Sequence, residues 1–179
     1  MILNNLLENL VLILPIVVLT IWACALILVD LFIPKERKEI TALLAALGLL
    51  VTLALVISQL GVSTSAFNGM FTVDGFASFL NVIFLFSGLV SIALAYDYLK
   101  RIGLEKSEYY ILLLFSIVGM MLMAGAADLI MVFLALELLS IPLYLLAGIA
   151  VPREDSSEAA LKYFLLGAFA SGFFLYGTA

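Results

Sequence analysis

The chain contains no histidine and a single cysteine, Cys24, among its 179 residues. Without histidine it lacks the usual axial ligand of haem and the commonest side-chain ligand of metals, which argues against a b-type cytochrome. One cysteine cannot form an intrachain disulfide. The sequence also has no glycine-rich nucleotide-binding motif and no cysteine cluster, so nothing in it indicates a dinucleotide, nucleoside triphosphate or iron–sulfur site.

Charged residues are scarce as well. They make up 12% of the chain and hydrophobic residues 66%, whereas soluble domains average about 25% and 45–50%. This composition predicts an integral membrane protein. The net charge of −5 is spread over short connecting segments, and no basic patch suggests a nucleic-acid partner. The first residues lack the basic region of a secretory signal, and the apolar run behind them is longer than a signal core, so we expect a retained first transmembrane helix.

Six apolar runs approach or exceed the length of about 20 residues that a helix needs to cross a bilayer. We therefore predict an all-α fold: a polytopic membrane helix bundle of six transmembrane helices, in a single domain over residues 1–179. The predicted helices run over about residues 10–33, 40–60, 74–98, 109–127, 129–150 and 157–179. Only Asp128 separates the fourth from the fifth, which predicts a very tight turn. The sixth ends the chain without a loop or tail, and we expect a truncated part of a longer protein.

The number of lysine and arginine residues alternates between high and zero from one connection to the next. Successive connections carry three (Lys35, Arg37, Lys38), none, three (Lys100, Arg101, Lys106), none and one (Arg153). The positive-inside rule then places the amino terminus outside and the odd-numbered connections in the cytoplasm. With six helices, the carboxyl end also lies outside.

Glu137 is the most unusual residue of the chain, because it lies in the middle of an apolar run of about one membrane span. A charge at bilayer depth costs roughly 2.5–3.5 kcal/mol on insertion scales, and such residues are usually functional. On a helix, Ser140, Tyr144 and Gly148 share its face. This stripe suits a packed helix interface or a water-lined path. The alternatives are a protonatable carrier and a neutral glutamic acid that locks two helices together.

Pro142, five residues beyond Glu137, removes a backbone hydrogen bond and tends to kink the helix. In a membrane, the freed carbonyl must be met by water or by a neighbouring side chain. From the residue alone, a packing role is the simpler interpretation.

Lys162 is the second candidate. It lies about 9 Å from mid-bilayer on the cytoplasmic side, at 1.5 Å per residue. Glu158 precedes it by four residues, the favourable order for a pair on one helix. A snorkelling lysine paired with Glu158 at the membrane surface is therefore a competing interpretation. The axial gap between Lys162 and Glu137 is about 13 Å by the same rise, so a direct ion pair between them is not expected.

The aspartates carry weaker signals. Asp74 is well placed to cap the third predicted helix. Asp128 is expected to cap or terminate a helix at the outer turn. Asp30 and Asp97 lie near cytoplasmic helix ends, close to basic residues, and are expected to be solvated.

The last predicted helix carries pairs of small residues four apart. Gly167 pairs with Ser171 and Ala168 with Gly172, which is the spacing of a common helix-packing signal in membranes. This spacing indicates close helix packing and nothing further.

Two motifs together resemble a known family. They are the run from Leu134 to Pro142 around Glu137 and the segment from Glu158 to Phe164 around Lys162, accompanied by Asp74-Gly75-Phe76 and the segment from Asp30 to Pro34. The chain resembles, over essentially its whole length, the antiporter-like subunit N (subunit 2) of NADH-quinone oxidoreductase, respiratory complex I. It would correspond to about the amino-terminal two-fifths of that subunit.

The resemblance implies a proton-translocating subunit in the membrane arm of a large assembly, in the inner (plasma) membrane. Glu137 and Lys162 would be its proton-relay candidates. In the family, the glutamate matching Glu137 interacts with a lysine on a seventh helix, which this sequence does not contain. NADH, FMN, iron–sulfur clusters and quinone are expected in other subunits, so no cofactor is expected on this chain. Its partners would be the other membrane subunits of complex I and the lipid bilayer.

Two other classes share parts of this pattern. A multisubunit cation/proton antiporter or a membrane-bound hydrogenase has the same glutamate and lysine motifs. A purely structural membrane scaffold would use Glu137 as an interhelical lock.

Overall fold

Seven helical segments and one small hairpin make up the computed structural model, which describes residues 9–34, 38–104, 106–151 and 153–178. In chain order, the elements are α2 (Leu14–Asp30), α3 (Glu39–Ser58), β1 (Thr64–Ala66), η2 (Phe67–Gly69), β2 (Phe71–Val73), α4 (Gly75–Arg101), α5 (Glu108–Gly125), α6 (Leu129–Ala147) and α7 (Glu154–Thr178). A further helical turn over residues 9–12 precedes α2. Each of the six long helices lies at one of the predicted segments, with ends that differ by no more than four residues.

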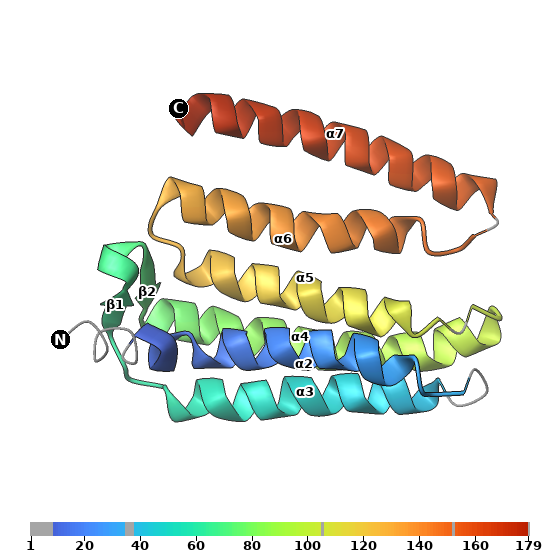
Figure 1. The fold of residues 1–179 in the computed structure, drawn as a ribbon, viewed down its shortest axis with the longest axis horizontal. Helices are drawn as coiled ribbons and strands as arrows, with labels where there is room; N and C mark the ends of the chain where they lie inside the picture. Colours follow the sequence, from blue (N-terminus) through green and yellow to red (C-terminus); the bar gives the residue numbers. More distant parts are fainter. Residues whose placement is uncertain (1–8, 35–37, 105, 152, 179) are drawn as a thin grey trace.

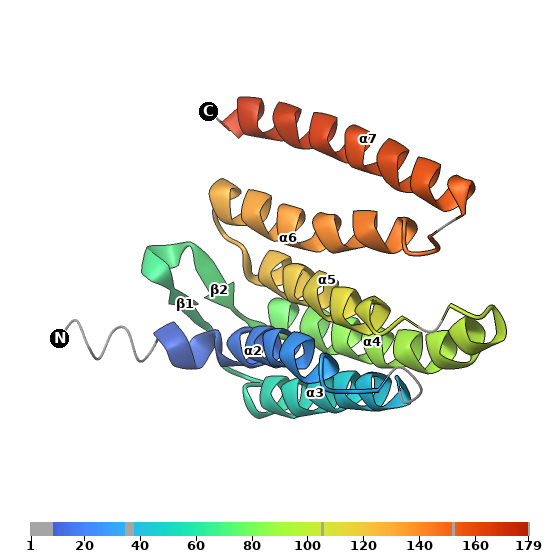
Figure 2. The ribbon, with the colours of Figure 1, turned by 45° about the vertical axis from the view of Figure 1, so that its right-hand side comes forward.

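The helices α2 to α5 form the core of the bundle, while α6 and α7 are added to it in sequence (Figures 1 and 2). The side chains of Leu19, Leu49, Leu85 and Leu114, one from each of these four helices, are fully buried. The helix α6 packs on α5, and α7 packs mainly on α6. No described residue of α7 is buried. The outer side of α7 is therefore an open apolar surface.

Small residues allow the core helices to approach closely. Gly48 on α3 packs against the ring of Trp22 on α2, whose Nε1 donates a hydrogen bond of 2.9 Å to the Leu44 carbonyl. Gly88 on α4 packs against Ile117 on α5. A Cβ atom at either glycine would overlap these side chains. Such contacts suit a bundle in lipid, where helix association depends on packing because the hydrophobic effect between helices is lost.

The connections alternate between the two ends of the bundle. The α2–α3, α4–α5 and α6–α7 connections lie at the right in Figure 1, and the α3–α4 and α5–α6 connections lie at the left. Lys38, Lys106 and Arg153 therefore share one end, as the charge pattern predicted. Lys35 and Arg37, which contribute to that pattern, lie outside the described residues, as does Ala179 at the end of the last predicted span.

The α3–α4 connection is not the simple loop that an all-α fold predicts. Strands β1 and β2 pair antiparallel, with Ser65 opposite Thr72, and β2 also bridges to the α5–α6 turn through Phe71 and Ala126. The Ala127 N–H donates to the Met70 carbonyl at 2.9 Å. The buried ring of Phe71 packs on Gly125. These contacts satisfy backbone groups of the tight turn between α5 and α6 and so hold the hairpin against that turn.

A proline near the start of α2 leaves a backbone carbonyl that another helix satisfies. Pro15 has no N–H, so the carbonyl four residues earlier, that of Val11, has no helical donor. The Gln59 side chain at the end of α3 donates to it at 2.8 Å. The bonds from Ile13 N–H to the Asn9 carbonyl and from Val17 N–H to the Ile13 carbonyl carry the helical ladder across this point. The polar Gln59 therefore repairs a helix that proline interrupts.

Among the described residues, five helices are long and apolar enough to cross a membrane by length and composition: α3, α4, α5, α6 and α7. The helix α2 is apolar but has 17 residues. The mostly helical, multi-span prediction is confirmed, except that the hairpin is an addition to the all-α class.

Candidate functional site

Glu137 occupies the middle of α6, a helix with well-defined limits. Asp128 caps its first turn, since the carboxylate accepts a hydrogen bond of 2.8 Å from the Ile130 N–H. The predicted capping role of Asp128 is confirmed. The helix continues through the buried Pro142 to Ala147. Glu137 is thus held on a regular helix, about 13 Å from its capped end at 1.5 Å per residue.

The partner of Glu137 is a hydroxyl on the neighbouring helix. The Ser171 Oγ of α7 donates a short hydrogen bond to Glu137 Oε1, and both residues are half-buried. A hydroxyl can donate to a carboxylate and accept from a carboxylic acid. Ser171 can therefore hold the Glu137 side chain in place in either protonation state.

The contacts on either side of this pair form an antiparallel seam between α6 and α7. Toward the basic end, the buried Tyr144 ring packs on Gly167 and meets the Tyr163 ring edge-on at 4.7 Å between centroids. Further along, Gly148 lies so close to Ala160 that a Cβ atom on the glycine would be 2.9 Å from the alanine Cβ. Three residues of the predicted stripe, Glu137, Tyr144 and Gly148, therefore face α7.

The opposite side of the seam ends in an aromatic pair. The Phe133 and Phe174 rings stack with centroids 6.1 Å apart, one turn from Glu137 and toward the capped end of α6. The carboxylate therefore lies between an aromatic pair and a tyrosine, in surroundings with few polar groups.

On its other side, α6 lies directly against α5. A Cβ atom on Gly119 would be 2.7 Å from the Leu139 Cα, so the two backbones are in contact. The neighbouring Ala135 is fully buried. This contact lies next to Glu137 in the sequence and fixes the position of the α6 backbone there.

Lys162 lies away from Glu137. Its ammonium group pairs with Glu158 at 2.5 Å, and the two side chains are 70% and 62% exposed within the chain. Lys162 precedes Ser171 by nine residues, which is about 13 Å along the helix and half a turn around it. The structure brings Glu137 and Ser171 together and leaves Lys162 on the outer side of α7.

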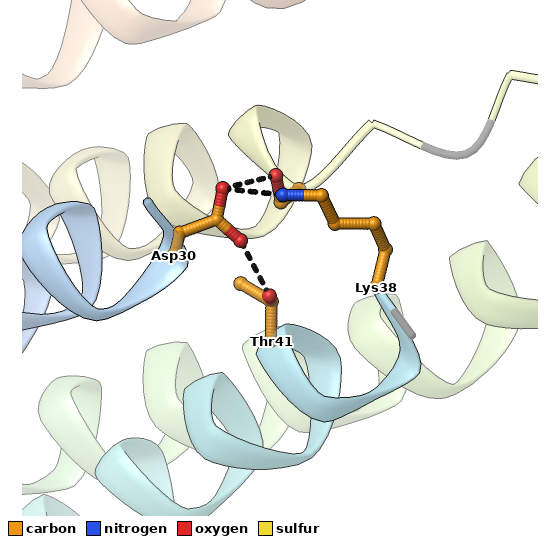
Figure 3. Close-up of polar contacts among 4 residues, drawn as sticks. Asp30, Lys38 and Thr41 are labelled. Carbon is orange, nitrogen blue, oxygen red and sulfur yellow. Dashed lines mark hydrogen bonds and ion pairs between the residues drawn. The ribbon is translucent and has the colours of Figure 1, made fainter. Parts of the chain in front are cut away.

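A second polar cluster lies at the basic end, where the sequence predicted a solvated aspartate. Asp30, the last residue of α2, accepts hydrogen bonds from Lys38 Nζ at 2.8 Å, Thr41 Oγ1 at 2.6 Å and Ser107 Oγ at 2.6 Å (Figure 3). The Asp30 and Lys38 side chains are only 15% and 17% exposed. The expectation of a solvated Asp30 is therefore wrong.

The Asp30 cluster joins three helices: Thr41 lies in the first turn of α3, and Ser107 immediately precedes α5. The carboxylate is buried because α2 and α5 are packed together, a long-range contact that no local pattern predicts. The sequence offered one indication of this cluster, because Thr41 and Ser107 place hydroxyl groups at the starts of two apolar helices. A buried acid needs such donors when no water reaches it.

The remaining predicted cap is confirmed. The Asp74 carboxylate accepts a hydrogen bond of 2.7 Å from the Ala77 N–H at the start of α4. In the described part of the chain, no group of three or more His, Cys, Asp or Glu side chains could hold a metal ion.

Comparison with known proteins finds similar sequences and structures. Residues 126–179, which include all of α6 and the described part of α7, match the family described as NADH:quinone oxidoreductase/Mrp antiporter, TM. The chain is 48% identical over 158 residues to NADH-quinone oxidoreductase subunit N 2 of Roseiflexus castenholzii, covering 88% of this chain and 32% of the relative. It is 49% identical over 166 residues to subunit N of Chloroflexus aggregans, covering 92% of this chain and 34% of the relative.

Among solved structures, the chain is similar to one chain of respiratory complex I from Thermus thermophilus with bound aureothin. That match has a TM-score of 0.76 and 35% identity, and it covers 91% of this chain and 35% of the other. The chain therefore spans about a third of the length of the curated relatives that it matches.

The apolar helices, with Glu137 at the contact between α6 and α7, define a multi-pass membrane protein with an antiporter-like domain. Within that class, the chain is similar to subunit N of NADH-quinone oxidoreductases over about a third of the length of that subunit. The resemblance that the Glu137 and Lys162 motifs carried is confirmed.

Proposed function

We propose that the chain is part of a proton-translocating subunit in the membrane arm of a bacterial NADH-quinone oxidoreductase. The observation that carries this proposal is the acidic side chain of Glu137, held by Ser171 within an apolar helix seam, in a chain 48% and 49% identical to two proteins named as subunit N. Its location would be the bacterial inner membrane, with the other membrane subunits of complex I and the bilayer as its partners. NADH oxidation and quinone reduction would take place in other subunits, with their cofactors.

In this proposal Glu137 is a protonatable relay. Ionisable side chains within transmembrane segments commonly mark proton relays, and Ser171 holds the Glu137 carboxyl group at a defined place between α6 and α7. Lys162 would contribute indirectly, through water or a third group, since about 13 Å of helix separates it from the Ser171 level.

The proposed topology has six membrane spans and an external amino terminus. The helical turn over residues 9–12, which hydrogen bonds across Ile13 join to α2, supports a first span, because 22 residues from Asn9 to Asp30 extend about 33 Å at 1.5 Å per residue. The three connections that carry Lys38, Lys106 and Arg153 would face the cytoplasm under the positive-inside rule. The hairpin and the α5–α6 turn would then face outward.

The test is Glu137→Gln in the complete complex. Glutamine keeps the shape and the acceptor for Ser171 but cannot exchange a proton, so we expect normal assembly with a large loss of proton pumping and of coupled quinone reduction. Asp97→Asn, which changes an exposed acid at the end of α4, is the matched control and should leave both activities unchanged. Wild-type pumping by Glu137→Gln would refute the relay.

A second candidate function is a subunit of a multisubunit cation/proton antiporter or of a membrane-bound hydrogenase. It is favoured by the matching family, whose description includes the Mrp antiporter. Copurification of an NADH-oxidising module would separate the two candidates. A purely structural scaffold makes a third prediction: an apolar residue of similar size, as in Glu137→Leu, would lower the yield of assembled complex and leave transport per assembled complex unchanged.

A further inference from the structure

A groove opens at the basic end of the bundle, between the last turns of α4 and α6. Its volume is about 490 Å³, within the range of about 300–1,000 Å³ that is usual for small-molecule sites. The helix α5, on which both flanking helices pack, begins only at Glu108, so the ends of α4 and α6 remain apart. Leu94 and Tyr98 form one wall, Leu146 and Ala147 the other, and Tyr109 lies between them.

The walls of the groove are mainly apolar, and one end of the groove carries a positive charge. Leu94 and Tyr98 are among the exposed large side chains of α4, a helix apolar enough to span a membrane, so this wall is an open and largely apolar surface of the described chain. Arg153 lines the groove on the α6–α7 connection. Among the described residues, no carboxylate lies within ion-pair distance of Arg153. Glu154 and Asp155 follow it in the sequence but do not line the groove.

A second cation lies beside the same end. Lys106 Nζ donates a hydrogen bond of 2.8 Å to the carbonyl of Ile149, which is itself a lining residue. An ammonium group has three donors, so this bond leaves Lys106 able to donate further. Ser156 anchors the same connection by donating to the Ala147 carbonyl at 2.7 Å. The cationic end is therefore held in a defined place.

We propose that this groove binds an anionic phospholipid, with one acyl chain along α4 and α6 and the phosphate group near Arg153 and Lys106. The charges favour this occupant, because Arg153, which has no carboxylate partner among the described residues, lies beside a second cation and complements a negative headgroup. Basic pockets between membrane helices bind such headgroups. The cationic end lies at the level of the basic connections, where lipid headgroups meet the protein. This binding does not depend on whether the chain translocates protons.

The test measures lipid binding to the purified assembly by native mass spectrometry after delipidation. The probes are phosphatidylglycerol, which is anionic, and phosphatidylcholine with the same acyl chains. We expect phosphatidylglycerol to bind preferentially and Arg153→Gln to weaken its binding about fivefold, the effect of one basic residue near a membrane surface. Arg153→Lys should retain the preference. Arg101→Gln, which removes an exposed cation of the same end outside the groove, is the matched control and should bind like wild type.

Ala147→Phe provides a test that does not involve charge, since it fills part of the groove and should lower the occupancy of phosphatidylglycerol. Equal binding of the two lipids, or the same small effect from Arg153→Gln and Arg101→Gln, would overturn the proposal. So would a protein helix of a neighbouring subunit seated in the groove of the assembled complex.

Discussion

Replacing Asp30 by asparagine provides the sharpest test of how the core helices are held together. Asparagine has nearly the same shape and can still bond the hydroxyls of Thr41 and Ser107, so the main loss is the negative partner of Lys38. Removing one member of a fully buried ion pair costs roughly 3–5 kcal/mol, because the other charge is left buried and unpaired. Exposed pairs contribute about 0–1 kcal/mol.

The Asp30–Lys38 pair resembles a buried pair more than an exposed one, because its side chains are only 15% and 17% exposed. We therefore expect Asp30→Asn to lower the free energy of unfolding by about 2–3 kcal/mol. That loss should appear as a lower midpoint of thermal unfolding. The measurement is thermal unfolding of the purified assembly in nanodiscs.

The matched control is Glu39→Gln, which breaks the Lys100–Glu39 pair, whose side chains are 56% and 57% exposed. Its expected cost is below about 1 kcal/mol. Adding Lys38→Met to Asp30→Asn should restore part of the lost stability, since it removes the unpaired charge. If Asp30→Asn lowers the midpoint no more than Glu39→Gln does, the cluster does not stabilise the bundle in the way that its burial implies.

Two further predictions concern helix contacts and a helix cap. Gly119→Ala should lower the free energy of unfolding by about 1–3 kcal/mol, because its methyl group would overlap the α6 backbone at Leu139. Gly172→Ala should be neutral or slightly stabilising, because a Cβ atom there meets nothing within 4 Å; equal unfolding midpoints for the two variants would contradict this account. Asp74→Ala should cost about 1 kcal/mol through loss of the α4 cap; the comparison is thermal unfolding against wild type, and an unchanged midpoint would show that the cap is dispensable.

The helices were predictable because their signals are local. A run of apolar residues as long as a bilayer is thick can satisfy its backbone groups only as a helix. The caps at Asp74 and Asp128 were predictable for the same reason, since each bonds an N–H two or three residues away. Glu137 was identifiable because an acid in an apolar run is costly wherever the helix packs.

The partners of these residues were not predictable from the sequence. Ser171 was recognised only as part of a packing pattern, because a serine 34 positions from Glu137 carries no mark of the helix that it will face. The basic neighbours of Asp30 in the sequence predict a solvated residue. Its burial depends on Ser107, 77 positions away, and on the packing of α2 against α5.

The membrane class, the helices, the basic end of the bundle and the resemblance to a known family can all be predicted from composition, local spacing and motif. The tertiary structure was needed to show that Glu137 faces Ser171, that Lys162 lies on the outer side of α7 and that Asp30 joins three helices. The hairpin that closes the α5–α6 turn belongs to the same group. Each of these contacts depends on which faces of the helices pack against each other, because side chains from segments far apart in the chain determine that packing.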